Sequence, residues 1–438
     1  MTAVRLWWSL ARHTHRESRV PTVLAVTAFA VTTWAVLTVA GGVRAFQARA
    51  QLPGADPTYP FLSWVAVALL VVPTATLGAA AARLTIARRD ERLAKLRLAG
   101  ATSAQTTLVA LLDAGAQALA GALAGVVLDL LALPAVALLR FQGRSFDIAE
   151  LRLGVAPVLA TVGAVLAVAL LSCAVSLRRV AISPLGVAQR LPQKGLSWVR
   201  VLPVLLLGGG FVAAFNAGSV LFGFGAAVGV LVLVGLLAGT FAVFNLVGPL
   251  FVSLLGRVLA ARARSVETLL AARRMGEDPK SVWRSVGGVS LVTFVAGCLS
   301  VAPGLTSGQD GADRLGADIG TGAAVTLVIS AVLAAVSTGV TQASRVLDSR
   351  ARYRGLHLAG TDLDVLHAAR ARETWIPLVV TMGGAAALSL LVVSPVLGLL
   401  RAAPVGVLWF VGCAVGGAVL VLLAARASRP LVTACASR

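Results

Sequence analysis

Acidic residues, aromatic residues and charge in general are scarce in this chain of 438 residues. Asp and Glu number 18 against 38 Lys and Arg, aromatic residues make up 5% and charged residues 13% of the chain. A soluble globular domain carries about 25% charged residues, so the composition excludes an ordinary soluble protein. The chain also lacks a GxxxxGKS/T run, so we do not expect it to hold nucleotide phosphates in a P-loop.

Cysteine and histidine are too few and too scattered for a metal site. The four cysteines occur singly in or beside apolar runs, at Cys173, Cys298, Cys413 and Cys435. They form no CxxC pair, and the first three are interpreted as small core residues. His13 and His15 form the one closely spaced histidine pair, on an expected surface helix, and no metal is predicted there.

Long apolar runs are abundant instead. Hydrophobic residues make up 58% of the chain and the mean hydropathy is +0.90. Runs of about 20 residues recur, each long enough to cross a bilayer core of about 30 Å as a helix. Ten spans are predicted, at 21–41, 61–82, 107–139, 153–177, 201–217, 219–255, 285–305, 320–341, 375–398 and 405–425. The sequence therefore predicts an all-α polytopic membrane protein of about ten transmembrane helices.

The basic residues are distributed unevenly between the loops. With the N-terminus inside, the inner segments carry 31 of the 38 Lys and Arg residues, and the outer loops carry the remaining 7. Loops rich in Lys and Arg stay in the cytoplasm, so both termini are expected to be cytoplasmic. The basic surface thus follows from topology and requires no nucleic acid. The bias towards Ala, Arg, Val and Gly indicates a GC-rich bacterium, hence a bacterial plasma membrane.

A basic segment, Arg88–Gly100, recurs in degraded form at 349–360. Four residues of each copy align at one offset of 260 positions: Leu96, Leu98, Ala99 and Gly100 with Leu356, Leu358, Ala359 and Gly360. A fixed offset indicates an internal repeat, which many membrane transporters contain. Asp113 and Glu373 share the same offset, and each is expected to lie near the inner interface and pair with a nearby arginine.

The third apolar run contains a small-residue face and an acid. Small residues at Gly121, Ala122 and Gly125 predict close helix packing. Asp129 lies deep in the run, where an acid is costly. It either contacts a cationic group of a substrate or pairs with an inward-facing arginine or asparagine of another helix, such as Asn216 or Asn245.

These features resemble the FtsX-like permeases, the membrane subunits of the MacB-type (type VII) ABC transporter superfamily. The resemblance rests on Arg88–Ala101 followed by Asp113 and the small-residue face, and on their counterparts 352–361 and Glu373. It implies two FtsX-like four-helix repeats, 1–189 and 262–438, joined by a linker with two spans at 190–261. The loops 42–60 and 306–320 are too short for the large extracytoplasmic domains that many family members carry.

The resemblance also implies how such a chain works. Segments 86–103 and 346–363 would be coupling surfaces for two copies of a separate ABC-type ATPase. The residues expected there are Arg92, Leu93, Leu96, Arg97, Gly100, Arg352, Leu356, Leu358 and Gly360. ATP and Mg would be bound by that partner, and this chain would bind no cofactor and carry no catalytic residue. A solvated amphipathic helix lying on anionic lipid is the alternative for these segments.

The favoured function is therefore a transporter permease that exports or extracts a lipid, drug or hydrophobic peptide. A non-transporting membrane relay for an ATPase is an alternative. An ion-coupled carrier without an ATPase is a third, and it would need several buried titratable groups near the midplane.

Overall fold

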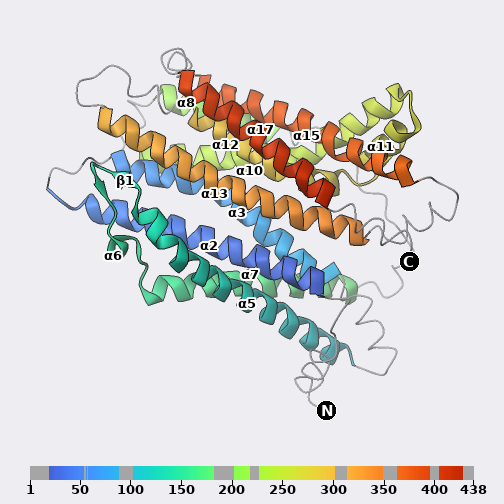
Figure 1. Cartoon of the computed structure of the whole chain (residues 1–438), viewed down its shortest axis with the longest axis horizontal. Coiled ribbons are helices and arrows are strands. Elements are labelled where there is room, and N and C mark those ends of the chain that lie inside the picture. Colours follow the sequence, from blue (N-terminus) through green and yellow to red (C-terminus); the bar gives the residue numbers. More distant parts are fainter. Residues whose placement is uncertain are drawn as a thin grey trace. The chain divides into compact units, whose positions relative to one another are not determined.

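The computed structural model describes residues 19–53, 56, 58–87, 102–181, 202–217, 226–300, 313–348, 363–394 and 404–427. Within these ranges the chain is helical except for connecting residues and one antiparallel hairpin of β1 (Arg140–Phe141) and β2 (Arg144–Ser145) (Figure 1). The helices are α2 (Arg19–Arg49), α3 (Thr58–Ala87), α5 (Ser103–Ala137), α6 (Ile148–Leu151), α7 (Val155–Ala181), α8 (Leu202–Asn216), α10 (Ala226–Arg262), α11 (Val266–Glu277), α12 (Pro279–Leu299), α13 (Asp313–Asp348), α15 (Leu363–Val393) and α17 (Pro404–Ala427).

Eight of these helices are long and apolar enough to cross a membrane: α2, α3, α5, α7, α10, α12, α13 and α15. The protein is therefore an all-α, multi-pass membrane protein, as predicted. Each of the ten predicted spans overlaps one helix. However, α8 has only 15 residues, and the described apolar stretch of α17 covers Phe410–Val419, so the count of ten stays a prediction.

Some predicted boundaries are wrong. The expected loop 42–60 begins too early, because α2 continues to Arg49. A Cβ at Gly41 would lie 2.6 Å from the carbonyl oxygen of Leu151, so this glycine permits close approach of the backbone rather than a turn. Helix α12 begins at Pro279, six residues before the predicted span. The Asp278 carboxylate caps it by accepting from the backbone N–H of Ser281 at 3.1 Å.

The chain divides into two compact units. Unit 1 comprises Met1–Arg44, Thr74–Val136 and Ile148–Gly195, and unit 2 comprises Ala45–Pro73, Ala137–Asp147 and Leu196–Arg438. The divisions fall within α2 and within α3. The predicted repeats at 1–189 and 262–438 concern duplication of the sequence, and they stay a prediction.

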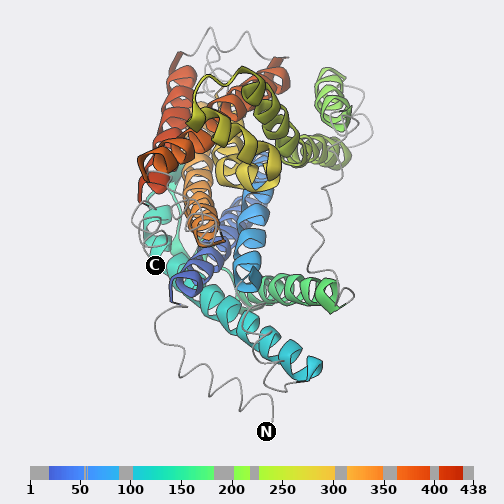
Figure 2. The same ribbon diagram turned by 90° about the vertical axis from the view of Figure 1, so that its right-hand side faces the viewer.

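Helix α12 is the centre of unit 2. It packs against α10, α13, α15 and α17 (Figure 2). Each of these four contacts involves a glycine, on α12 or on its neighbour: Trp283 meets Gly248, Gly288 meets Ala334, Gly297 meets Ser389, and Val289 meets Gly417. Small residues let helix backbones approach closely in a membrane, where packing rather than water exclusion holds helices together. A Cβ at Gly248, Gly297 or Gly417 would overlap the neighbouring side chain, whereas one at Gly288 would be in ordinary van der Waals contact with Ala334.

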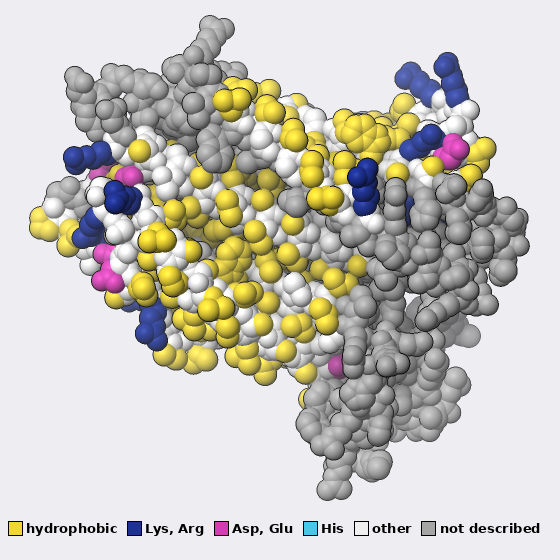
Figure 3. Space-filling model, viewed as in Figure 1, with side chains coloured by type: hydrophobic (Ala, Val, Ile, Leu, Met, Phe, Trp, Pro, Cys, Tyr) yellow, Lys and Arg dark blue, Asp and Glu magenta, His cyan; other side chains and the backbone are white. Residues whose placement is uncertain are grey.

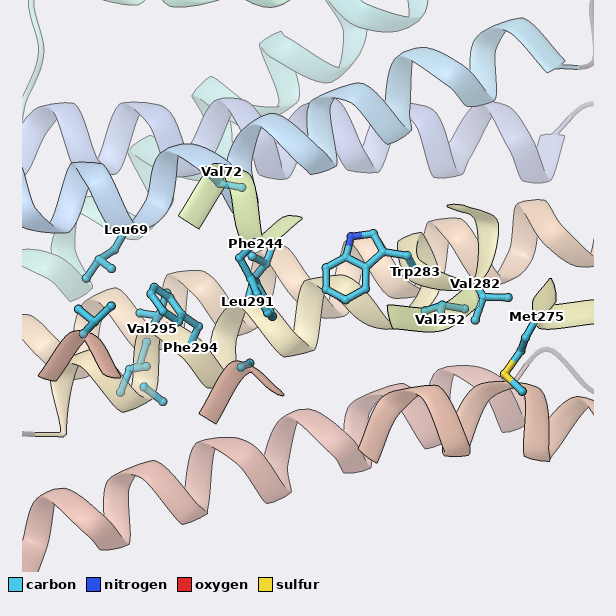
Figure 4. Close-up of a cluster of buried hydrophobic side chains, with 14 of the residues drawn as sticks. Leu69, Val72, Phe244, Val252, Met275, Val282, Trp283, Leu291, Phe294 and Val295 are labelled. Carbon is cyan, nitrogen blue, oxygen red and sulfur yellow. The ribbon is translucent and has the colours of Figure 1, made fainter. Parts of the chain in front are cut away.

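The apolar core of unit 2 surrounds α12 (Figure 4). Trp283, Leu291, Phe294 and Val295 project from α12 and are at most 4% exposed. The ring of Phe244 meets Trp283 edge-on at 5.6 Å between centroids. Such edge-to-face pairs stabilise a fold by about 0.5–1.5 kcal/mol beyond their buried area.

Unit 1 contains the predicted small-residue face of α5. A Cβ at Gly121 would lie 2.5 Å from Phe29 Cβ of α2, and one at Gly125 would lie 2.5 Å from the carbonyl oxygen of Ala30. Ala122 is fully buried. The prediction of close helix packing along this face is therefore confirmed.

Charged side chains lie towards the ends of the helices. On the face shown in Figure 3, Lys, Arg, Asp and Glu gather over the β1–β2 hairpin and over α11. Mainly hydrophobic side chains cover the surface elsewhere among the described helices on this face. This distribution suits a bilayer, whose core excludes charge and whose borders accept it.

Candidate functional site

A polar cluster joins α2, α3, the hairpin and α13 within unit 2. We call it the hairpin clasp, and its residues are Arg49, Tyr59, Phe141, Gln142, Ser145, Phe146 and Asp318. The Asp318 carboxylate, 8% exposed, accepts from the hydroxyl of Tyr59 at 2.6 Å and from the backbone N–H of Gln142 at 2.7 Å. Gln142 has a φ of 58° and Gly143 one of 76°, as a tight hairpin turn requires. Asp318 thus holds the one non-glycine residue of the hairpin that adopts a strained backbone conformation.

Arg49 fixes the same hairpin from the end of α2. Its guanidinium donates to the carbonyl oxygens of Phe141 and Ser145, each at 3.0 Å. The group also lies 4.2 Å from the ring centroid of Phe146, close enough for a cation–π contact. Arg49 is 3% exposed, so these contacts replace the water that a buried cation has lost.

Two ion pairs join α11 to the beginning of α15. Arg372 donates to Glu267 Oε2 at 2.9 Å, to Thr268 Oγ1 at 2.8 Å and to Ser265 Oγ at 2.5 Å. Arg274 lies 3.6 Å from Glu373, and both of these side chains are largely buried. The sequence predicts an arginine partner for Glu373, and α11 supplies it.

Glu267 lies in the first turn of α11, where its negative charge is stabilised. Its own backbone N–H and the Ser265 hydroxyl, followed by Arg372, favour the charged form and lower the pKa of this carboxyl. A carboxylate in the first turn of a helix is further favoured by the helix dipole. The α11–α15 junction is therefore a charge-dependent contact at one end of unit 2.

Hydroxyl groups rather than charges join the helices in the interior of unit 2. Ser290 of α12 donates to Thr381 Oγ1 of α15 at 2.8 Å, and both side chains are buried. Ser285 and Thr293 donate to carbonyl oxygens of their own helix. Such contacts suit a bundle in lipid, because they satisfy polar groups at a modest energetic cost.

In unit 1, Asp129 is joined to a neighbouring helix, as one of the two expectations had it, and its described partner is a hydroxyl group. Thr38 of α2 donates to Asp129 Oδ1 at 2.8 Å. A hydroxyl 91 positions away in the sequence leaves no trace in its pattern. The side chains of Asn216 and Asn245 lie outside the described part of the chain, so a pairing with them stays a prediction. Asp113, which was expected to pair with an arginine, accepts from Gln117 Nε2 at 3.4 Å.

The predicted ATPase-coupling residues lie outside the described part of the chain. This applies to Arg92, Leu93, Leu96, Arg97, Gly100, Arg352, Leu356, Leu358 and Gly360. His13 and His15 also lie outside it. The coupling assignment stays a prediction.

The residues of the hairpin clasp were not identified from the sequence. Arg49 and Asp318 fall in segments expected to be loops, where a charge indicates solvent. The sequence offered one indication, which is that Asp318 and Tyr59 each lie directly before an apolar run and so near the end of a helix. Only the fold shows that these ends meet.

Two negative findings complete the description of the sites. Among the described residues, no group of three or more His, Cys, Asp or Glu could hold a metal ion. Comparisons with family models, with curated proteins and with solved structures found no match for this chain.

Proposed function

We propose that this chain is the permease subunit of an ATP-binding-cassette transporter of the FtsX-like kind. It would couple ATP hydrolysis by a separate ATPase to export or extraction of a hydrophobic or amphiphilic substrate. One observation supports this proposal: two pairs of helices have the same spacing along the chain as the two basic segments. Helix α12 begins 260 residues after α2, and α15 begins 260 residues after α5, the offset that relates the two basic segments.

The placement of the basic segments favours a docking role. The first lies between α3 and α5, and the second between α13 and α15. In the first copy, Leu93, Leu96 and Leu98 are interspersed with Arg92, Lys95 and Arg97, which offers apolar groups with a cationic border to a partner. The second copy keeps two leucines and its arginines but has Gly355 and His357 where the basic pattern would continue. Two copies in one chain fit two copies of an ATPase, whose closure would move one repeat against the other.

The short connections between helices favour a substrate handled in the bilayer. Only residues 50–57 connect α2 to α3, and residues 300–312 connect α12 to α13. Neither connection has room for a folded domain that could capture a water-soluble substrate. A lipid, a lipophilic drug or a hydrophobic peptide reaches the helices directly from the membrane.

We further propose ten spans with both termini in the cytoplasm of a bacterial cell. Tyr59 and Asp318 are 2.6 Å apart, so they lie on the same side of the membrane. Between them the chain passes through α3, α5, α7, α8, α10 and α12. An even number of crossings is needed to return to the same side, which requires α8 to cross as well as the five long helices.

Co-purification tests the docking proposal. The wild-type chain and the variant with Leu96→Asp and Leu356→Asp are each co-expressed with an ABC-type ATPase of the same genome and purified through a tag on the permease. We expect the wild type to retain the ATPase and the double variant to lose it, because two carboxylates would charge both apolar strips.

A matched control makes the loss specific. Leu269, 41% exposed on α11, lies outside both basic segments, so Leu269→Asp is expected to retain the ATPase. Size-exclusion chromatography and thermal unfolding check that all variants stay folded. Absence of any ATPase from the wild type, or its retention by a folded double variant, would contradict the coupling assignment.

A further inference from the structure

Helix α13 carries a row of buried residues that is polar at four of its five positions. We call this the α13 row: Thr326, Ser330, Ala334, Thr338 and Gln342. Successive members are four residues apart, so they form one ridge along the helix. All five are at most 5% exposed. The row extends over about 24 Å, most of the roughly 30 Å thickness of a bilayer core.

Three members of the row have polar atoms without a hydrogen-bond partner. Within the described part of the chain, Ser330 Oγ, Thr338 Oγ1 and Gln342 Nε2 are buried and unbonded. Several buried hydroxyl groups of the same unit are bonded instead. Thr326 donates to Gly322, and the hydroxyls of α12 named above are also satisfied.

Burial without a partner is energetically unfavourable. Each unsatisfied buried group costs about 1–3 kcal/mol, and in a membrane no water is at hand to reduce that cost. Three such groups on one ridge would therefore be selected against in a static bundle, where leucine or valine would pack better. They are favourable if water or a ligand reaches them in another conformation of the same helices.

The packing of the row indicates which helix contact would open. Ala334, the middle member, contacts Gly288 of α12, with 3.4 Å between its Cα and a Cβ built at Gly288. Around this contact lie Val286, Val289 and Leu378, an apolar cluster that has no interhelical hydrogen bond of its own in the described residues. By contrast, α12 is bonded to α15 through Ser290 and Thr381. The contact of α12 with α13 at Ala334 is apolar, so it can separate while the Ser290–Thr381 hydrogen bond stays intact.

The chemistry of the row indicates what it accepts. Its polar groups are hydroxyls and an amide, and none is charged. They donate to and accept from uncharged polar groups, and they would not compensate a charge in a low-dielectric setting. An apolar cluster beside the row suits a hydrocarbon chain.

We propose that the α13 row lines a slot between α12 and α13 that takes the uncharged polar head group of an amphiphile, whose chain stays against the neighbouring apolar cluster. This deepens the proposed function by naming the substrate class, and it rests on that function for the transport step. Binding itself requires no ATPase.

Cysteine accessibility tests the slot in the full chain, reconstituted in lipid vesicles. The four native cysteines are replaced by alanine, and Ser330→Cys and Thr338→Cys are introduced singly. Each variant is treated with 2-(trimethylammonium)ethyl methanethiosulfonate, a charged reagent that reacts with thiols in water. Although both positions are buried, we expect labelling about tenfold faster than at Leu333→Cys, because a minor open state exposes the row. Leu333 is 1% exposed on the same helix and is the matched control.

Two amphiphiles with the same chain then test the head group. Monooleoylglycerol in the vesicles is expected to slow labelling of both row cysteines, whereas oleate, with a charged head group, is expected to have little effect. Labelling as slow as at Leu333→Cys, or fast labelling that monooleoylglycerol leaves unchanged, would overturn the proposal. Since no ATPase takes part, a failed co-purification leaves this result intact, and the two proposals fail separately. Ser330→Cys exchanges only oxygen for sulfur, so it keeps the test valid if Thr338→Cys does not fold.

Discussion

Arg49 shows how one residue fixes the end of a helical bundle. It brings a charge into a buried position, which is unfavourable unless every lost hydrogen bond to water is replaced. Two carbonyl oxygens of the hairpin and the face of Phe146 provide that replacement. In return, the hairpin carbonyls acquire partners that an isolated pair of two-residue strands could not offer them. The planar guanidinium group of arginine donates to both oxygens at once through its two terminal nitrogens, whereas the single ammonium group of lysine does not match this geometry.

The substitution Arg49→Ala is expected to lower the free energy of unfolding by about 2–4 kcal/mol, because two buried carbonyl groups lose their partner. Arg49→Lys is expected to recover only part of this loss. The measurement is unfolding in mixed micelles, combined with the rate of tryptic cleavage in the hairpin. Arg44→Ala is the comparison, since Arg44 lies on the same helix and donates to one carbonyl oxygen, that of Arg152, at an exposed position. Water can replace that hydrogen bond, so its loss is expected to change stability by less than about 1 kcal/mol. Equal effects of the two substitutions would refute the role given to Arg49.

Glu267 leads to a prediction about pH. Its pKa is lowered in the folded chain from 4.5, chiefly by its own backbone N–H and the Ser265 hydroxyl. A lowered pKa contributes stability that is present above the unfolded value and is lost as pH falls through the folded value. The wild type should therefore be more stable than Glu267→Gln at neutral pH, and the difference should disappear at pH values well below 4.5.

Unfolding of both proteins over a series of pH values measures this difference. Ser265→Ala provides a second comparison. It removes the helix cap at every pH, which costs about 1 kcal/mol, and it is also expected to reduce the pH-dependent part. A difference between wild type and Glu267→Gln that is constant with pH would show that the carboxyl charge has no part in the α11–α15 junction.

At the scale of elements, the close approach of α5 to α2 depends on glycine. Gly125→Ala is expected to lower the free energy of unfolding by about 1–3 kcal/mol, because the added methyl group would overlap the backbone of Ala30 and force the helices apart. Gly163→Ala on α7 is the matched control, since no atom lies within 4 Å of a Cβ built there. Alanine favours the helix, so this control should be neutral or stabilising by up to about 1 kcal/mol. Thermal unfolding of the two variants in the same detergent distinguishes these outcomes, and equal loss in both would contradict the packing argument.

The positions of the helices were largely predictable, and their ends were not. Apolar runs of the right length identify each long helix, because the bilayer imposes that length. The ends depend on particular contacts instead. The sequence around Gly41 indicates a turn, yet this glycine lies within α2 and allows the backbone of Leu151 to approach closely. Asp278 reads as part of a loop, yet it caps α12. Polarity alone cannot distinguish such residues from those of a solvated loop.

At the scale of the whole molecule, the sequence predicts which segments are repeated but not which residues of different helices contact one another. The offset between the basic segments is visible in the chain itself, and so is an acid such as Asp129. The partner of that acid, Thr38, and the meeting of Tyr59 with Asp318 depend on how the helices pack. The α13 row could have been found from its spacing. What the sequence cannot reveal is that three of its polar atoms are buried without partners.

The crossing of α8 is the prediction that decides the topology of the whole chain. With 15 residues, α8 is about 22 Å long, shorter than an average bilayer core, so length alone argues against a span. Two independent observations favour one. The contact between Tyr59 and Asp318 requires an even number of crossings between them. In addition, without α8 the basic segment around α11 would lie outside the cell, against the preference of Lys and Arg for the cytoplasm. We therefore expect local thinning of the bilayer around α8.

An alkaline phosphatase reporter inserted after Ala217 should be active, because that enzyme folds only outside the cytoplasm, whereas one inserted after Glu277 should be inactive. The reverse activities would leave α8 on the inner surface and would separate Tyr59 from Asp318 by a whole membrane.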